Sequence, residues 1–334
     1  MAKYPSPPAR PACRGAVTGY DTGVPQAMRA ITFTLTVLFA VAVAVTEVAH
    51  PYTAAAQARD GELRVATFNI HKGADGDDHY DLQRTIEAIA SFNADLVALQ
   101  EVMRNKAQFN CDDQATLIAE GLTRLTQRKW TFTYVKSWIF DNRECLQSGR
   151  GNDVETEGVV LFSPQQMVST NAIRLAESRV GVAARVASMP DVPVVTTHLA
   201  AGRRQQANRL LQIGALMLWM DAERAGIFMG DMNSRPEAPE LVPLMARYRD
   251  AWLEGMERGV ASGGPTCCVV GEAARTRFDY IFYDPTGPLA LESIDVRSTA
   301  TATHGEVSDH LPVIATFRRT PSRASVIQSS SAAR

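Results

Sequence analysis

Ten short β-type runs, interrupted by only four helical segments, are the feature that most restricts the fold of this chain. Apolar spacings of three and four predict helices over 81–92, 114–127, 203–222 and 236–245. The β-type runs span 63–69, 96–100, 131–135, 158–162, 181–186, 192–197, 226–230, 278–283, 291–297 and 313–317. Because no internal repeat or long linker interrupts this order, the pattern predicts one domain of mixed helices and strands, about 260 residues long.

Two local patterns refine the helical segments. Ser234 stands three residues before Glu237, the spacing of a capping box, so we expect Asp231-Met232-Asn233 to form the loop that leads into the fourth helix. In the third helix an apolar stripe is expected to face the core. The stripe consists of Leu210, Leu211, Gly214, Met217 and Leu218.

The amino terminus has the pattern of an export signal. Met28-Arg29 precedes a largely apolar run from Ile31 to Val45, and small residues around Ala56 and Ala58 offer cleavage sites. We therefore expect a signal peptide over 28–58 and a secreted or periplasmic mature protein. The alternative is a membrane anchor, although the run is short for a span of about 20 residues.

The remaining segments divide simply. Residues 1–27 are expected to be a disordered extension or the result of a mis-set start, and residues 320–334 a disordered tail. The folded domain is expected to cover 59–319. The whole chain has 34 Lys and Arg against 36 Asp and Glu, and without residues 1–58 the balance is 30 against 34. This slight acidity argues against tight, sequence-independent binding to nucleic acid, although it allows a local basic groove.

Four cysteines lie in the predicted domain, an even number in a chain expected to leave the reducing cytosol. We expect a bridge between Cys111 and Cys145. Cys267 and Cys268 are neighbours, which cannot easily bridge each other without backbone strain, so their connectivity stays open. Zinc binding is the alternative, but the spacing fits no common zinc pattern.

One pattern recurs six times: an apolar run ends in residues that can bind a metal or transfer a proton. A single carboxylate after a strand is usually a turn or a helix cap, and a lone histidine is usually structural. The six together indicate a catalytic site. They end in Asn69, in Gln100-Glu101, in His198, in Asp231-Met232-Asn233, in Asp279 and in Ser308-Asp309-His310.

In this order and with these neighbours, the six segments resemble the endonuclease/exonuclease/phosphatase superfamily, which includes deoxyribonucleases, sphingomyelinases and inositol-polyphosphate phosphatases. The resemblance covers Leu63 to Phe317 and weakens between about 103 and 157, where Cys111 and Cys145 lie. It implies an α+β fold, a four-layer α/β/β/α sandwich of the deoxyribonuclease type. The site then lies at the edge where strand ends meet.

Phosphodiester hydrolysis needs a stabilised phosphoryl oxygen, a positioned water and help for the leaving group. Glu101 is the best candidate metal ligand, because a carboxylate after an apolar strand suits a hard, oxygen-binding ion such as Mg²⁺. By resemblance, Asn69 and Asp309 complete or border the metal site. Mn²⁺ is the alternative ion.

The catalytic roles follow from the resemblance. Asp231 orients or deprotonates the attacking water, and Asn233 donates a hydrogen bond to the phosphoryl oxygen; in an extended segment both side chains would face one phosphate. His310 stands beside the scissile phosphate and Asp279 pairs with it. His198 matches the leaving-group acid of deoxyribonuclease-like enzymes, and it differs from the Tyr of relatives that act at abasic sites.

The substrate-binding candidates are Asn69, His71, Lys72 and Arg204. Arg203 and Arg209 could also contact phosphate, although arginines near helix starts are usually solvated. Thr266 lies before Asp279 as a turn residue does in relatives, where it shapes the loop.

These observations predict an exported, Mg²⁺-dependent hydrolase of phosphate esters, preferably a phosphodiesterase or endonuclease that acts on nucleic acid. The alternatives are a phospholipid or sphingomyelin phosphodiesterase, then an inositol phosphatase. From another class, a catalytically silent phosphate-binding module would use the same pocket. We expect a monomer without a stable protein partner.

Overall fold

The structure is a computed structural model that describes residues 61–269 and 274–320. The predicted extension 1–27, the predicted signal peptide 28–58 and residues 321–334 of the predicted tail lie outside the described residues. Among the described residues, no helix is both long enough and apolar enough to cross a membrane.

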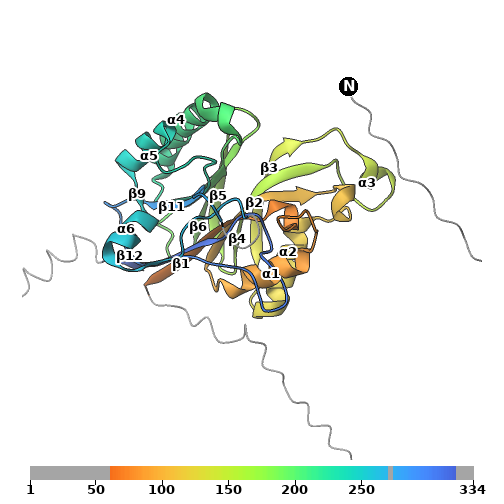
Figure 1. Cartoon of the computed structure of the whole chain (residues 1–334), viewed down its shortest axis with the longest axis horizontal. Helices are drawn as coiled ribbons and strands as arrows, with labels where there is room; N and C mark the ends of the chain where they lie inside the picture. The colour runs from red at the N-terminus through yellow and green to blue at the C-terminus, as the bar shows by residue number, and fades with distance from the viewer. Residues whose placement is uncertain (1–60, 270–273, 321–334) are drawn as a thin grey trace, which may run out of the picture. The chain divides into compact units, whose positions relative to one another are not determined.

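Two mixed β-sheets form the centre of the described part (Figure 1). The seven-stranded sheet has the order β10 (Ala261–Ser262), β12 (Leu289–Val296), β13 (Val313–Arg319), β1 (Glu62–Asn69), β2 (Leu96–Arg104), β4 (Thr156–Ser163) and β3 (Thr131–Ile139). The six-stranded sheet has the order β5 (Met167–Arg174), β6 (Val180–Val186), β7 (Val194–His198), β8 (Ile227–Asp231), β11 (Asp279–Tyr283) and β9 (Arg249–Asp250).

Alternation along the strands builds the layers. In β1, Leu63 and Val65 belong to the core between the two sheets, whereas Ala66 and Phe68 belong to the core under the helices on the other face. Because successive strand residues point to opposite faces, a strand covered on both sides is apolar almost throughout. This explains why the β-type runs were continuous in the sequence.

Helices cover the outer faces of both sheets (Figure 1). The first pair is α1 (Leu82–Ser91) and α2 (Gln114–Thr126), whose first turns are capped by Asp81 and Asp113. On the six-stranded sheet lie α4 (Gln206–Glu223) and α5 (Val242–Arg247). The short helices are α3 (Glu144–Gln147), α6 (Ala251–Arg258) and the 3₁₀ turns η1 (His71–Gly73), η2 (Ala107–Phe109), η3 (Arg203–Gln205) and η4 (Pro239–Leu241). The predicted α/β/β/α sandwich is confirmed.

All ten predicted strands are present, and the sequence missed β5, β9 and β10. β9 and β10 have two residues each, too few for a pattern. β5 is an exposed edge strand in which polar and apolar residues are mixed, so it lacked a buried face to reveal it.

The predicted apolar stripe of the third helix is wrong except for Met217, which packs against the core. Leu210, Leu211 and Leu218 are exposed in α4, whereas Ile213 and Leu216 are buried. The packed face was hidden in the sequence because it also contains buried polar residues, which are Arg209 and Gln212.

The predicted capping box is also wrong. The Ser234 hydroxyl donates to Glu240 Oε1 at 2.7 Å, and Arg209 Nε donates to the same oxygen at 2.8 Å. The predicted helix over 236–245 is replaced by η4 and α5. Ser234 therefore serves a buried polar cluster and not a helix start.

Two disulfides are present among the described residues. Cys111 bonds Cys145, as predicted. Cys267 bonds Cys268, the connectivity that the sequence left open.

Candidate active site

The strand registers bring the predicted residues to one edge of the two sheets. His198, at the end of β7, is paired with Asp231 at the end of the parallel strand β8. Asp231 is in turn paired with Asp279 on the antiparallel strand β11. In the other sheet, Asn69 at the end of β1 is paired with Gln100 of β2.

The sequence suggested that all of these residues follow strand ends, but some of them do not. Asp279 is the first residue of β11, and Asp309 and His310 precede β13. An antiparallel strand begins at the edge where its neighbour ends, so starts and ends meet there. Glu101 lies inside β2 at an irregularity of the ladder, with a left-handed φ of 57°. Such a bulge changes the direction of a side chain.

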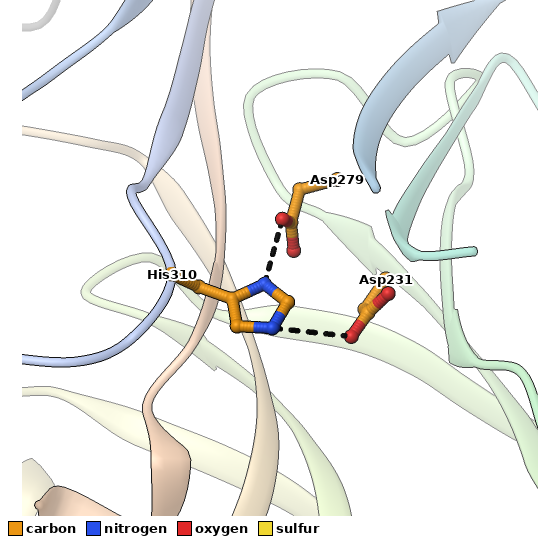
Figure 2. Close-up of side chains that lie close together, drawn as sticks. All are labelled: Asp231, Asp279 and His310. Atoms are coloured by element: carbon orange, nitrogen blue, oxygen red, sulfur yellow. Dashed lines mark hydrogen bonds and ion pairs between the residues drawn. The ribbon is translucent and has the colours of Figure 1, made fainter. Parts of the chain in front are cut away.

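Three buried side chains form the centre of the site (Figure 2). His310 Nδ1 lies 2.8 Å from Asp279 Oδ2, and His310 Nε2 lies 3.8 Å from Asp231 Oδ2. Ligand atoms of these three residues all lie within 4.8 Å of one another. The imidazole is therefore held between two carboxylates.

The two histidines of the site, His310 and His198, differ in charge. Burial opposes protonation of His310, but the carboxylates of Asp279 and Asp231 overcome it and raise the pKa of His310 to about 10. Burial and the charge of Arg179 lower the pKa of His198 to about 4, although its Nε2 lies 3.5 Å from Asp231. Near neutral pH His310 is a cation and His198 is neutral.

Asp231 is the carboxylate that both histidines face. Burial and the charge of Asp279 raise its pKa above the usual value, against the opposing effects of the histidines. A carboxylate with a raised pKa accepts a proton more readily, which suits a base that takes a proton from water.

Asn69 links Asp231 to Glu101. Its Nδ2 donates to Asp231 Oδ2 at 3.0 Å and to Glu101 Oε1 at 3.3 Å, while its Oδ1 accepts the His71 N–H at 3.0 Å. The amide thus faces the carboxylates with its nitrogen. Coordination of a metal by Asn69 would require the amide to turn, and this role stays a prediction.

Glu101 is ionised. Burial opposes this, but His198 and the Lys72 ammonium, 2.6 Å from Oε2, lower the pKa of Glu101 to about 2. Lys72 therefore lies in the site, as predicted, and neutralises the carboxylate proposed to bind the metal.

Asn233 departs from the expected geometry. Its φ of 48° is left-handed, so the segment after Asp231 is not extended. The backbone N–H of Asn233 donates to Asp231 Oδ1 at 2.8 Å, and the side chain donates to the Leu199 carbonyl at 3.2 Å. The Asp-x-Asn spacing thus fixes the Asp231 carboxylate by a tight turn, and the contact of Asn233 with phosphate remains predicted.

The remaining candidates lie at different depths. His71 Nδ1 lies 3.9 Å from Asp309 Oδ1, and both side chains are partly exposed at the rim. Arg204 is exposed in η3 and forms no ion pair with any described residue. The structure therefore groups His71 and Asp309 with the site, whereas Arg204 has no contact that assigns it there.

Two site residues escaped the sequence analysis. Glu157 and Arg179 stand at the starts of β4 and β6, and only run ends had been searched. Burial and the charge of Glu101 raise the pKa of Glu157 to about 7. Arg179 is buried and interacts electrostatically with Glu157, Asp231 and Glu101. A charged residue directly before an apolar run was the overlooked pattern.

The donor set fits a divalent cation. Five carboxylates interact at this site with the cations Lys72, Lys106, Arg179 and His310. Carboxylate oxygens are the ligands that Mg²⁺ and similar hard ions prefer. The carboxylates are Glu101, Glu157, Asp231, Asp279 and Asp309.

Backbone features hold this site in place. A Cβ on Gly230, where φ is 144°, would lie 2.1 Å from the Thr197 carbonyl oxygen, so only glycine lets β7 and β8 approach here. The Ser308 hydroxyl donates to the Asn69 carbonyl at 2.8 Å and accepts the His310 N–H at 3.1 Å. It thereby ties the histidine to β1.

Comparison with known proteins finds a family model that matches most of the chain. Residues 66–310 match the model described as the Endonuclease/Exonuclease/phosphatase family. No curated protein matches the sequence.

Solved structures share the fold. An endonuclease/exonuclease/phosphatase from Beutenbergia cavernae is 22% identical with a TM-score of 0.59, covering 78% of this chain and 72% of that one. The human Nocturnin catalytic domain with bound sulfate is 21% identical with a TM-score of 0.57, covering 79% and 95%. D. rerio TDP2 complexed with a single-strand DNA product is 18% identical with a TM-score of 0.54, covering 78% and 100%.

Proposed function

The chain belongs to the endonuclease/exonuclease/phosphatase family, and from this premise we propose that it is a Mg²⁺-dependent phosphodiesterase acting on nucleic acid. Members of this family are typically hydrolytic phosphoesterases and generally use a divalent metal. The observation that carries the proposal is the buried group of Asp231, Asp279 and His310 beside the ionised Glu101.

Each residue has a defined task in this proposal. Asp231 orients the attacking water and takes its proton, which its raised pKa favours. His310 remains protonated and donates its Nε2 proton to a phosphoryl oxygen, because Asp279 occupies Nδ1. Arg179 supplies positive charge to the same phosphate.

Glu101 and Asp309 are the residues proposed to hold the cation. When bound, the cation would stabilise the charge that develops on the phosphoryl and leaving oxygens. Lys72 must then leave Glu101 or share it, and its ammonium becomes available to the substrate.

His198 is proposed to serve the leaving oxygen. Its neutral state near pH 7 means that it cannot donate a proton in the ligand-free protein. The negative charge of a bound phosphate would raise the pKa of His198 and allow it to hold a proton for the leaving group.

A nucleic-acid substrate is supported by a neighbour of the same fold, TDP2, which was solved with a single-strand DNA product. The slightly acidic balance, 34 Lys and Arg against 36 Asp and Glu, argues against a tightly held duplex. The alternative remains a phospholipid or sphingomyelin phosphodiesterase.

A substrate panel tests the proposal. We expect the full chain with Mg²⁺ to hydrolyse single-stranded DNA or RNA faster than sphingomyelin or phosphatidylcholine vesicles, and Asp231→Asn to lose at least about 10²-fold in rate. Faster hydrolysis of a lipid would select the alternative substrate. If the protein binds phosphate but hydrolyses none of the tested substrates in the presence of metal, a silent binding module would be favoured.

We further propose that the protein acts outside the cytoplasm as a monomer, after cleavage near Ala56 or Ala58. Two disulfides suit an oxidising compartment. The N-terminal residue of the protein recovered from the periplasm or medium, determined by mass spectrometry, tests this. A product that retains residues 31–45 would support the membrane anchor, and light scattering would show the oligomeric state.

A further inference from the structure

Trp138 lies at the site without a task in the reaction above. It is paired with Glu157 across β3 and β4. Because side chains directly opposite each other in an antiparallel ladder share one face, Trp138 and Glu157 both project from the same side of the sheet. Trp138 is partly exposed, although a large aromatic side chain is usually buried.

The guanidinium of Arg179 lies over one face of this indole. Its Cζ is 5.9 Å from the Trp138 ring centroid. Arg179 also interacts electrostatically with Glu157, Asp231 and Glu101, so it links the indole to the catalytic group. β3 belongs to one sheet and β6 to the other, and the pair therefore spans the gap between the sheets at the active edge.

Arg179 lacks the partners that a buried arginine normally has. Only 7% of its surface is exposed, yet its Nε and Nη1 make no hydrogen bond to any described residue. Buried donors without partners carry a large desolvation cost, so their presence here indicates a ligand that accepts these hydrogen bonds.

A second tryptophan and arginine pair gives an internal comparison. Arg277 lies 5.2 Å from the Trp252 ring, close to the distance in the first pair. There the guanidinium forms two short contacts with the Asp250 carboxylate, at 2.9 and 2.7 Å. Arg277 thus has a carboxylate partner within the protein, although its Nη2 makes an ion pair and no hydrogen bond, whereas Arg179 has neither an ion pair nor a hydrogen bond at Nε and Nη1 among the described residues.

We propose that Trp138 and Arg179 form a subsite for a nucleotide, in which Arg179 binds the phosphate and the indole of Trp138 stacks on the base. Every nucleobase has a planar face that can stack on an indole without regard to sequence. This inference rests on the proposed function and names the substrate feature that the site recognises.

The alternative occupant of an indole is the quaternary ammonium of a choline lipid. The guanidinium of Arg179 already lies near the ring at 5.9 Å, so a second cation there would meet like charge. An uncharged base meets no such repulsion. The geometry therefore favours the nucleotide.

Equilibrium binding tests the subsite without requiring turnover. The full chain with Mg²⁺ is titrated with adenosine 5′-monophosphate, with ribose 5-phosphate, which lacks the base, and with phosphocholine. We expect the nucleotide to bind at least about fivefold more tightly than ribose 5-phosphate. Trp138→Leu should abolish this preference and Trp138→Phe should retain most of it, while Trp252→Phe should change neither affinity.

Arg179→Lys tests the phosphate half of the subsite separately from the base half. We expect it to weaken the binding of adenosine 5′-monophosphate and of ribose 5-phosphate by a similar factor. A Trp138→Leu variant that keeps the preference, in a chain that hydrolyses phosphodiesters, would overturn the base subsite alone. Tighter, Trp138-dependent binding of phosphocholine would also overturn it. Failure to bind any of the three ligands, together with no hydrolysis, would remove the proposed function as well.

Discussion

At the scale of single residues, the site depends on keeping charge buried. His310 holds a proton against desolvation only because Asp279 contacts its Nδ1 at 2.8 Å and Asp231 lies near its Nε2. Removing one charged residue of such a group leaves the buried charges of the other residues uncompensated. The charge state of each residue therefore depends on the other residues of the group.

The raised pKa of His310 predicts how the free energy of unfolding depends on pH. The pKa of His310 is raised from 6.5 to about 10, so its charged form stabilises the folded state fully below pH 6.5. That contribution is lost as the pH rises toward 10. In metal-free protein, we expect the free energy of unfolding of the wild type, relative to His310→Gln, to decline over this window.

Urea unfolding in EDTA at several pH values measures the decline. A difference between the two proteins that stays constant from pH 6.5 to 10 would show that His310 is not held as a cation.

Gly230 makes a second prediction at this scale. A Gly230→Ala side chain would lie 2.1 Å from the Thr197 carbonyl oxygen, so we expect it to lower the free energy of unfolding by about 3 kcal/mol or to prevent folding. Gly214 is the matched control, because nothing lies within 4 Å of its added Cβ in α4. Gly214→Ala should stabilise the protein by about 0.5 to 1 kcal/mol. Equal thermal shifts for the two variants would contradict this account.

At the scale of elements, the segment around Thr266 connects Asp279, the first residue of β11, with the loop that carries His310 before β13. The Thr266 hydroxyl oxygen accepts the N–H groups of Phe278 and Asp279, each at 3.0 Å. Its carbonyl accepts the Leu311 N–H, directly after His310. Thr266 therefore fixes Asp279 relative to His310, the loop role that the sequence suggested.

Thr266→Val keeps the shape of the side chain but removes the acceptor. We expect it to cost about 1 to 3 kcal/mol of stability, since two buried N–H groups lose a partner. We also expect about tenfold or more loss of kcat, because misplaced catalytic groups react slowly. Thr266→Ser retains the oxygen and should retain most activity. Equal kcat values for the Val and Ser variants would refute the positioning role.

The exposed apolar face of α4 gives another prediction. Leu218 is 76% exposed and Leu216 is fully buried. Leu218→Gln should change the free energy of unfolding by less than about 0.5 kcal/mol. Leu216→Ala should lower it by about 2 to 5 kcal/mol. A large loss in the first variant would place this helix face against a partner.

These elements also show where the sequence was informative. Strands buried on both faces, such as β1 and β8, were found because their apolar runs are continuous. The packed face of α4 was not found, since Arg209 and Gln212 are buried there by hydrogen bonds to distant groups. Tertiary partners of that kind leave no periodic pattern in the chain.

At the scale of the whole molecule, the site exists only where two sheets meet. Asn69, Glu101 and His198 were recognisable as candidates from their places after apolar runs. Glu157 and Arg179 were not, because their position at the same edge follows from antiparallel pairing within each sheet, β4 with β2 and β6 with β7. The order of the strands in each sheet determines which residues become neighbours, and this order cannot be deduced from the sequence pattern alone.

The carboxylate-rich group at this edge leads to the central claim, that the site becomes a phosphodiesterase when a divalent ion joins it. The most direct measurement is the rate of hydrolysis of a single-stranded oligonucleotide against Mg²⁺ concentration, for the wild type and Glu101→Gln. We expect the wild type to be inactive in EDTA and to regain its rate with Mg²⁺, and the variant to need at least about tenfold more Mg²⁺. Hydrolysis that persists in EDTA, or that has the same Mg²⁺ dependence in both proteins, would contradict it.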